Sequence, residues 1–223
     1  SFEVIAGEEA SFIAGPYTDQ GFGIGSNGFP GFKPSAAGKF SRQNYAFYVD
    51  VEAQFTEDFL MGYALRYEDY SSFGDTTNFK VTAQYDVTDE FSLRGSVSTG
   101  FRAPTVGQAN YANVQTNLDG GVLVDSALLP PTNAVAVQLG ANELTPEESK
   151  SMAFGAVWSI NDFHFTLDYY NIEVTDRVSQ SAKLDLSAED KAILKADGVP
   201  NVDSIQQVSF FTNDFDTTTE GFD

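Results

Sequence analysis

The chain has 223 residues, of which 32 are acidic and 12 are Lys or Arg, so its formal net charge is −20. Such an acidic excess argues against a nucleic-acid binder, because affinity for nucleic acid comes from Lys and Arg side chains that neutralise phosphates. The chain has no Cys and a single His, His164, which excludes disulfides, thiolate metal sites and any metal site built from several His residues. Its 20 Phe, 10 Tyr and 19 Gly residues favour β-structure with many turns.

The first part of the chain differs from the rest. Residues 1–43 are rich in Gly and Phe and show neither the two-residue period of a strand nor the 3.6-residue period of a helix. We therefore predict a loop region over residues 1–43.

From Asn44 onward, aromatic and aliphatic residues alternate with polar ones, as they do along a strand. Acidic turns of two or three residues follow Thr56 and Thr88, and a similar turn occurs at Asn161. The apolar positions of the first three predicted strands are Tyr45, Phe47, Val49, Val51, Ala53 and Phe55, then Phe59, Met61, Tyr63, Leu65 and Tyr67, then Phe79, Val81, Ala83, Tyr85 and Val87.

This alternation fits two architectures equally well. A water-soluble β-sandwich would bury the apolar face in its core, and a membrane β-barrel would turn the same face toward lipid. Two further features favour the barrel. The predicted strands have about 10 residues or more, enough to cross a bilayer, and short turns at one end contrast with long loops at the other.

The long loops are predicted at about 101–145 and 179–203. Within the second, Ser187 and the acids after it predict an N-cap, and the pattern that follows predicts one short helix near 187–197 that ends at Gly198. A further strand is predicted from Val208 to Asp223. Too few strands are present to close a barrel around loops of this size, so the chain is interpreted as a piece of one.

Three segments resemble the barrel of TonB-dependent outer-membrane receptors. The segment Gly100-Phe101-Arg102-Ala103-Pro104-Thr105-Val106-Gly107-Gln108 follows an alternating strand, as a motif of that family does. The segments from Leu144 to Ser149 and from Asp168 to Val178 resemble later family segments, in the same order and at a similar spacing. The resemblance covers the chain from about Phe40 to its end.

The resemblance implies the fold class and a location. The fold would be all-β, part of a large antiparallel transmembrane barrel with long extracellular loops, in the outer membrane of a Gram-negative bacterium. The family has a 22-stranded barrel plugged by an N-terminal domain. Residues 1–43 would then be an extracellular loop region and residues 44–223 a partial barrel, with the plug and the TonB-binding segment absent from this chain.

The resemblance also implies a function and partners. The parent receptor would take up a large scarce nutrient (ferric siderophore, cobalamin or oligosaccharide) by active transport, without chemistry on the substrate. Its partners would be outer-membrane lipid, the TonB complex through the missing N-terminal part, and a small-molecule or chelate ligand. Exposed strand edges would let the fragment self-associate. A soluble all-β binding module or surface adhesin is the alternative.

The candidate site residues are the family motif and the polar positions that would face the lumen. Arg102 could hold a plug or ligand carboxylate through its fork of donors, or it could pack the loop that follows. The full set of candidates is Phe101, Arg102, Ala103, Pro104, Arg66, Arg94, Asp168 and Tyr170.

No enzyme, cofactor or metal site is predicted. His164 alternates away from the apolar face and is interpreted as a polar wall residue, since no Ser lies in a nucleophile elbow. The acidic pairs Glu147-Glu148 and Glu189-Asp190 are interpreted as helix capping and solubility, because no calcium-loop spacing surrounds them.

Overall fold

The computed structural model describes residues 2–4, 38–119, 121–200 and 202–223. The chain divides into two compact units. The first, called the loop unit, comprises residues 1–41, 104–144 and 178–213; the second, called the sheet unit, comprises residues 42–103, 145–177 and 214–223. Within the described residues, no helix is both long and apolar enough to span a membrane.

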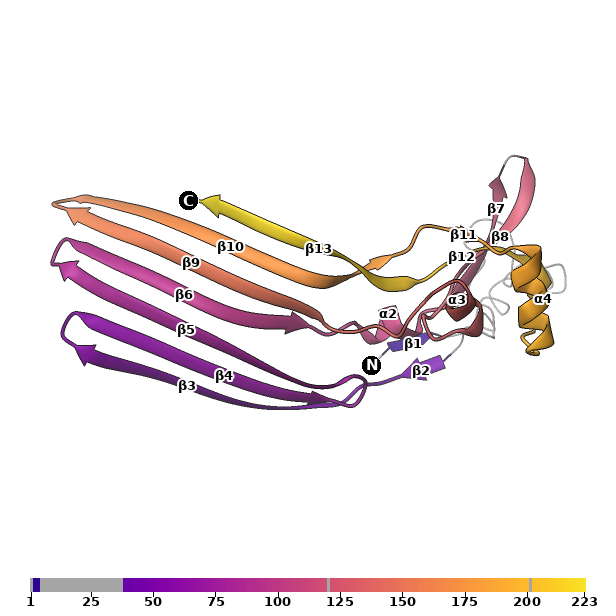
Figure 1. The fold of residues 1–223 in the computed structure, drawn as a ribbon, viewed down its shortest axis with the longest axis horizontal. Coiled ribbons are helices and arrows are strands. Elements are labelled where there is room, and N and C mark those ends of the chain that lie inside the picture. Colours follow the sequence, from indigo (N-terminus) through magenta and orange to yellow (C-terminus); the bar gives the residue numbers. More distant parts are fainter. Residues whose placement is uncertain (1, 5–37, 120, 201) are drawn as a thin grey trace, which may run out of the picture. The chain divides into compact units, whose positions relative to one another are not determined.

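Seven long strands build the sheet unit (Figure 1). The strands lie side by side in the order β13-β10-β9-β6-β5-β4-β3, and the paired neighbours from β3 to β10 run antiparallel. Their bounds are β3 (Asn44–Thr56), β4 (Phe59–Tyr70), β5 (Gly74–Thr88), β6 (Phe91–Arg102), β9 (Glu147–Ile160), β10 (Phe163–Gln180) and β13 (Phe211–Phe222). The sheet is open, with β3 and β13 at its edges.

Tight turns connect these strands where the sequence predicts them. Only Glu57 and Asp58 separate β3 from β4, and only Asn161 and Asp162 separate β9 from β10. Asn161 has a φ of 52°, a left-handed conformation that asparagine tolerates and that two-residue hairpin loops require. Gly74 begins β5 with a φ of 91°, which a residue with a Cβ atom rarely adopts.

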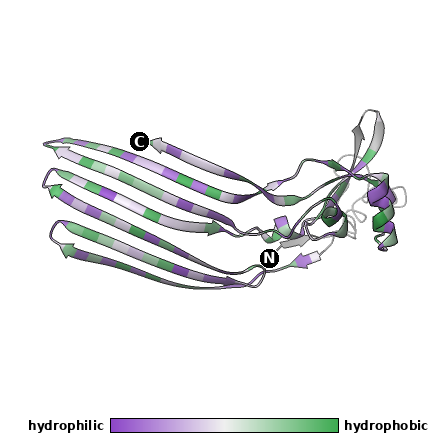
Figure 2. Cartoon of the chain, in the orientation of Figure 1, coloured by the Kyte–Doolittle hydropathy of each residue, from purple (hydrophilic) through white to green (hydrophobic). Residues whose placement is uncertain are grey.

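Hydrophobic and hydrophilic residues alternate along the long strands (Figure 2), which gives the sheet one apolar face and one polar face. Register places Phe47 opposite Tyr67 and Val49 opposite Leu65, so the alternating residues of successive strands fall on the same side. This side, called the apolar face, also carries Phe79, Phe154 and Leu167 and is largely exposed. Its counterpart, the polar face, carries the intervening residues.

The loop unit has a sheet and a core of its own. Its four-stranded sheet has the order β11-β12-β8-β7, in which β12 and β8 run parallel, and β1 pairs with β2 separately. The bounds are β1 (Phe2–Val4), β2 (Gly38–Phe40), α2 (Val106–Asn110), β7 (Asn113–Asp119), β8 (Val122–Leu128), α3 (Ala134–Gln138), β11 (Leu184–Asp185), α4 (Ala188–Ala196), η3 (Val202–Ser204) and β12 (Ile205–Ser209).

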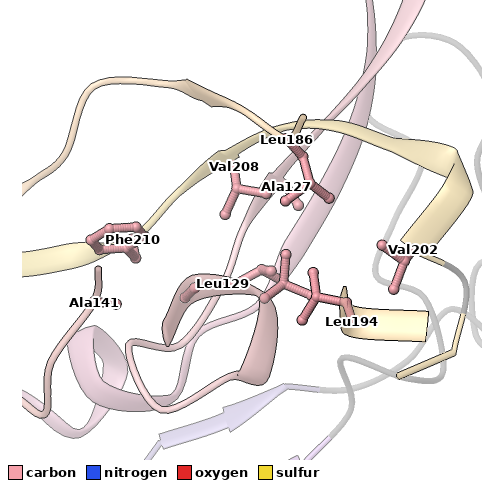
Figure 3. Close-up of a cluster of buried hydrophobic side chains, with 10 residues drawn as sticks. Ala127, Leu129, Ala141, Leu186, Leu194, Val202, Val208 and Phe210 are labelled. Carbon is pink, nitrogen blue, oxygen red and sulfur yellow. The ribbon is translucent and has the colours of Figure 1, made fainter. Parts of the chain in front are cut away.

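Ten buried side chains form the core of the loop unit (Figure 3). Leu194 of α4 and Val208 of β12 are 2% and 0% exposed, and burial of such side chains contributes about 1.5–3 kcal/mol each. The remaining members are Ala127, Leu129, Val135, Ala136, Ala141, Leu186, Val202 and Phe210. Eight of the ten come from the two predicted loops, and Val208 and Phe210 follow the second loop, so segments far apart in the sequence pack together.

The short helix is confirmed. Ser187 is the N-cap of α4, and its hydroxyl and the Asp190 side chain form a reciprocal capping box with the backbone of the opposite residue. Gly198, with a φ of 79°, follows the end of the helix. The acids at 189 and 190 thus lie in the first turn of a helix, as the sequence predicts.

Other local expectations differ from the structure. The 101–145 segment shows no clear periodicity, yet it contains α2, α3 and the β7–β8 hairpin. The predicted strand from Val208 is two strands, β12 and β13, separated at Phe210. Most of the predicted 1–43 loop region, residues 5–37, lies outside the described residues.

Candidate functional site

The polar face of the sheet holds most of the predicted site residues. Register places Arg94 of β6 opposite Gly155 of β9, and Gly155 opposite Asp168 of β10, in one row across three strands. Strand alternation puts Arg66 and Arg102 on the same face as Arg94. The structure therefore gathers on one surface the charged candidates that the sequence separates by up to about a hundred positions.

Arg94 and Asp168 form a two-pronged ion pair that crosses the strand between them. The guanidinium donates from Nε to Oδ1 over 2.9 Å and from Nη2 to Oδ2 over 2.5 Å. This parallel geometry satisfies both carboxylate oxygens and makes the pair stronger than a single contact. Because β6 and β10 are not adjacent, the bond has to pass over β9.

Gly155 makes that crossing possible. A Cβ atom at position 155 would lie 1.9 Å from Oδ1 of Asp168 and 3.2 Å from Nε of Arg94. Glycine is the residue that leaves room for two side chains to meet directly above the backbone. Gly155 is not among the candidate site residues of the sequence, and the signal that points to it is a glycine in the middle of a strand, which marks a close approach.

Arg102 is paired with Glu147 at the end of the sheet where the long segment 103–146 leaves and returns. Arg102 of β6 and Glu147 of β9 are cross-strand partners. Nε of Arg102 donates to Oε2 of Glu147 over 2.7 Å, and Nη2 donates to Oε1. The Glu147 side chain is 6% exposed, whereas that of Arg102 is 55% exposed. Helix capping was therefore wrong for Glu147, which begins strand β9 as a buried anion neutralised by Arg102.

Glu68 is the centre of a third polar cluster. It is 5% exposed and accepts hydrogen bonds from Nε of Arg66, from the Tyr70 hydroxyl over 2.7 Å and from Nδ2 of Asn44 over 3.3 Å. These partners satisfy a buried carboxylate, which would otherwise be costly to remove from water. Arg66 is thus engaged by a residue of its own strand.

The family motif divides into two structural parts. Phe101 packs its ring against Tyr70 and Phe73, with ring centroids 5.7 and 6.5 Å apart, and the Arg42 guanidinium lies 5.0 Å from the centre of the Tyr70 ring. Through ring and cation–π contacts, this cluster joins the ends of β4 and β6 to the turn between β4 and β5.

The second part of the motif starts helix α2. Ala103 and the buried Pro104 lead to Thr105, the N-cap of α2. The Thr105 hydroxyl accepts from the backbone N–H of Gln108 over 3.0 Å, and the Gln108 side chain accepts from the Thr105 N–H over 2.9 Å. The motif thus combines a strand end with a capping box that turns the chain into a helix.

Tyr170 covers a glycine on the edge strand. A Cβ atom at Gly221 of β13 would lie 2.7 Å from the Tyr170 hydroxyl oxygen, so the phenol ring occupies the space above that glycine. Neighbouring Tyr169, on the apolar face, donates from its hydroxyl to Glu220 over 3.2 Å. Both tyrosines therefore contact β13.

His164 lies near the short turn between β9 and β10. Its Nδ1 is 2.9 Å from the Ser159 hydroxyl oxygen, and the His164 side chain is exposed. In the part of the chain that the structure describes, no three His, Asp or Glu side chains are grouped closely enough to hold a metal ion.

A shallow hollow of about 350 Å³ opens on the polar face beside the Arg94–Asp168 pair. The polar side chains of Glu52, Thr82, Gln84 and Ser96 line it together with apolar residues such as Leu60 and Ala153. Such a surface suits contact with a polar solute or with another polypeptide segment.

Comparison with known proteins agrees with this two-faced sheet. The family model described as TonB dependent receptor-like, beta-barrel matches residues 4–222. The chain therefore belongs to the family of TonB-dependent receptor β-barrel domains. No curated protein sequence matches the chain.

Several solved structures share the fold. The siderophore receptor PirA from Pseudomonas aeruginosa is 15% identical with a TM-score of 0.62, and the match covers 86% of this chain and 32% of PirA. PirA from Acinetobacter baumannii is 15% identical with a TM-score of 0.57, over 81% and 25% of the two chains. A mutant ferric enterobactin receptor PfeA from Pseudomonas aeruginosa, solved with enterobactin, is 12% identical with a TM-score of 0.61, over 81% and 24%. The chain thus spans between about a quarter and a third of the length of these receptors.

Proposed function

We propose that this chain forms part of the barrel wall of a TonB-dependent receptor in the outer membrane of a Gram-negative bacterium. The observation that carries the proposal is the two-faced sheet, in which Phe47 and Val49 are 73% and 62% exposed while the opposite face holds ion pairs. Lipid accounts for such an apolar face, and a lumen accounts for the polar one. A soluble binding module would bury the large apolar side chains, so this alternative is disfavoured.

We infer that the polar face lines the lumen, with Arg66, Arg94, Asp168 and Tyr170 as wall residues. Each of the three guanidinium groups binds a carboxylate of the wall itself; the pairs are Arg66–Glu68, Arg94–Asp168 and Arg102–Glu147. Their first role is then to hold the wall in register, and plug or ligand contacts use the donors and acceptors that remain exposed around the hollow.

The long segments would serve as extracellular loops. In this proposal, residues 1–43, 101–145 and 179–203 lie outside the cell, and the loop unit gives the second and third of them a packed core of their own. A packed core presents binding residues on a stable support, which an unstructured loop would not.

The parent receptor would import a large scarce nutrient without chemistry on it, with energy supplied by the TonB complex. A ferric siderophore is the first class to test, because the solved structures of similar fold are siderophore and ferric enterobactin receptors. Cobalamin and oligosaccharides are the other classes.

The test is transport by the native cell. Deletion of the gene for the parent receptor should abolish uptake of one radiolabelled ligand class, and a plasmid copy should restore it. A protonophore that collapses the inner-membrane gradient should stop uptake but leave ligand binding at the surface intact. A parent protein found in the soluble fraction, with uptake of all three classes unchanged by the deletion, would overturn the proposal.

A further inference from the structure

The sheet opens into a fork between β5 and β6, at the end where the segment 103–146 leaves. Pairing of these two strands stops at Lys80 and Ser98, although each strand stays paired with its other neighbour beyond this level. Figure 1 shows the two strands diverging toward this end. Residues 74–79 of β5 and 99–102 of β6, all within the described part of the chain, therefore lack partners in each other's strand.

Side chains, rather than backbone bonds, hold the two arms of the fork. At its base, the Phe79 N–H donates to the Thr99 hydroxyl over 3.1 Å, where a continued ladder would use a backbone carbonyl. At its mouth, the Phe101 ring reaches across to the rings of Tyr70 and Phe73. Between these two contacts, the backbone groups that face the gap have no strand partner among the described residues, so they need water or a ligand.

A hollow of about 220 Å³, called the fork hollow, occupies this gap. Thr77 and Phe79 of β5 and Thr99 and Phe101 of β6 contribute to its lining. It is smaller than the sites of drug-sized ligands, which measure roughly 300–1,000 Å³. The fork hollow therefore suits one small ring rather than a large chelate.

Two rows of side chains border the fork hollow on the side of the sheet that carries the apolar face, one step past Val97 and Met152. Register places Thr99, Lys150 and Glu173 side by side in the first row, and Phe101, Glu148 and Thr175 in the second. With about 4.8 Å between strands and about 6.8 Å between the rows, these side chains start within an area of about 10 by 7 Å. All of them line the fork hollow.

The charged side chains of the two rows are available to a ligand. Within the described residues, the side chains of Glu148, Lys150 and Glu173 form no hydrogen bond and no ion pair, although Lys150 and Glu173 are direct cross-strand neighbours. Two carboxylates and one ammonium give the fork hollow a net negative charge, which disfavours phosphate and other anions. Carboxylates accept strong hydrogen bonds from hydroxyl groups, and an ammonium donates to their oxygens.

We propose that the fork hollow is a carbohydrate site that binds one neutral sugar ring. Sugar hydroxyls donate to Glu148 and Glu173 and accept from Lys150, while the C–H groups of the ring pack on Phe101. The unpaired backbone groups of the fork supply further donors and acceptors. The sugar belongs either to a free oligosaccharide or to a glycan at the cell surface. This site goes beyond the proposed transport function, because its two rows lie on the side of the sheet opposite the Arg94–Asp168 pair.

The test measures sugar binding directly. The parent receptor is placed in phosphatidylcholine nanodiscs, which contain no sugar, and saturation-transfer difference NMR is recorded with glucose, galactose, mannose and N-acetylglucosamine. We expect at least one of these sugars to bind. Glu148→Gln and Glu173→Gln keep the side-chain shape but remove an ionised acceptor, so each should weaken binding about tenfold or more. Asp69→Asn is the matched control, because Asp69 is an exposed carboxylate on the same side of the sheet but outside the fork hollow.

Sugar analysis of receptor purified from native cells distinguishes the two sources. A sugar that the native receptor retains and that either Gln variant reduces about tenfold identifies a cell-surface glycan. Binding of an added sugar without a retained one identifies a free oligosaccharide. Equal binding by the native receptor and both Gln variants would overturn the site, and so would the absence of sugar from both experiments. Neither result bears on transport, which the uptake experiment tests separately.

Discussion

The carboxylate of Asp168 occupies the space where any side chain at position 155 would begin. An added Cβ atom at Gly155 would lie 1.9 Å from Oδ1 of Asp168, and this close approach allows Arg94 to reach Asp168 across an intervening strand. The Arg94–Asp168 ion pair thus links β6 to β10 across β9, and it can do so because residue 155 of β9 is a glycine.

Gly155→Ala is expected to destabilise the barrel by roughly 1–3 kcal/mol, the usual cost of overpacking, because the new methyl group has to displace the ion pair. Gly95→Ala is the matched control in the adjacent strand, since its Cβ would meet its closest neighbour at 3.6 Å, an ordinary contact. Unfolding of the purified receptor in denaturant measures both. Equal stability of the two variants would show that the pair does not depend on Gly155.

Arg102 and Glu147 are expected to be energetically coupled. Replacement of Arg102 by Ala removes the guanidinium that neutralises the buried Glu147 carboxylate, with a cost of about 1–2 kcal/mol once the exposure of the guanidinium is taken into account. The variant R102A/E147A should lose about 1 kcal/mol less than the sum of the two single variants. A double-mutant cycle on unfolding free energies measures this coupling, and strict additivity would contradict it.

The start of helix α4 is expected to loosen in acid. Hydrogen bonds from the Ser187 side chain, and then from that of Gln138, hold the pKa of the Asp190 carboxyl below its ordinary value of 3.8. A lowered pKa means that the capping contribution is complete above about pH 4, the unfolded value, and is lost as the pH falls through the lower, folded value.

Hydrogen exchange of the α4 amides should therefore change little between pH 7 and pH 5, after correction for intrinsic rates, and rise below pH 4. Asp190→Asn should remove this acid dependence. A rise centred near neutral pH, or one that persists in Asp190→Asn, would point to a different group.

Arg substitutions at two neighbouring residues of β3 test which face of the sheet contacts lipid. Val49 and Tyr48 are 62% and 73% exposed but lie on opposite faces. Val49→Arg is expected to cost roughly 2–4 kcal/mol and to lower the amount of receptor in the outer membrane, because the charge would lie in hydrocarbon. Tyr48→Arg should have a mild effect. Immunoblots of membrane fractions measure both, and equal tolerance at the two positions would contradict a lipid-facing Val49.

Local pattern was enough to predict the first long strands of the sheet unit and the short helix. Alternation from Tyr45 to Phe55 indicates both a strand and its two faces, because the two-residue period is set within the strand itself. Ser187 and Gly198 indicate the helix between them, because caps act on backbone groups a few residues away. The motif around Phe101 indicated the family for the same reason, as a contiguous run of residues.

Tertiary structure alone decided which residues meet. Arg94 and Asp168 are 74 positions apart, and only the register of three strands brings them together over Gly155. Glu147 resembled a solvent-exposed helix cap until pairing placed it opposite Arg102. The core around Val208 draws on both long segments. The first of them, residues 101–145, lacks a readable period because its short elements are held by distant contacts rather than by local propensity. The residue pattern along the chain specifies the period of each strand and which residues share a face. The partners across neighbouring strands depend instead on the register, which the whole sheet sets cooperatively.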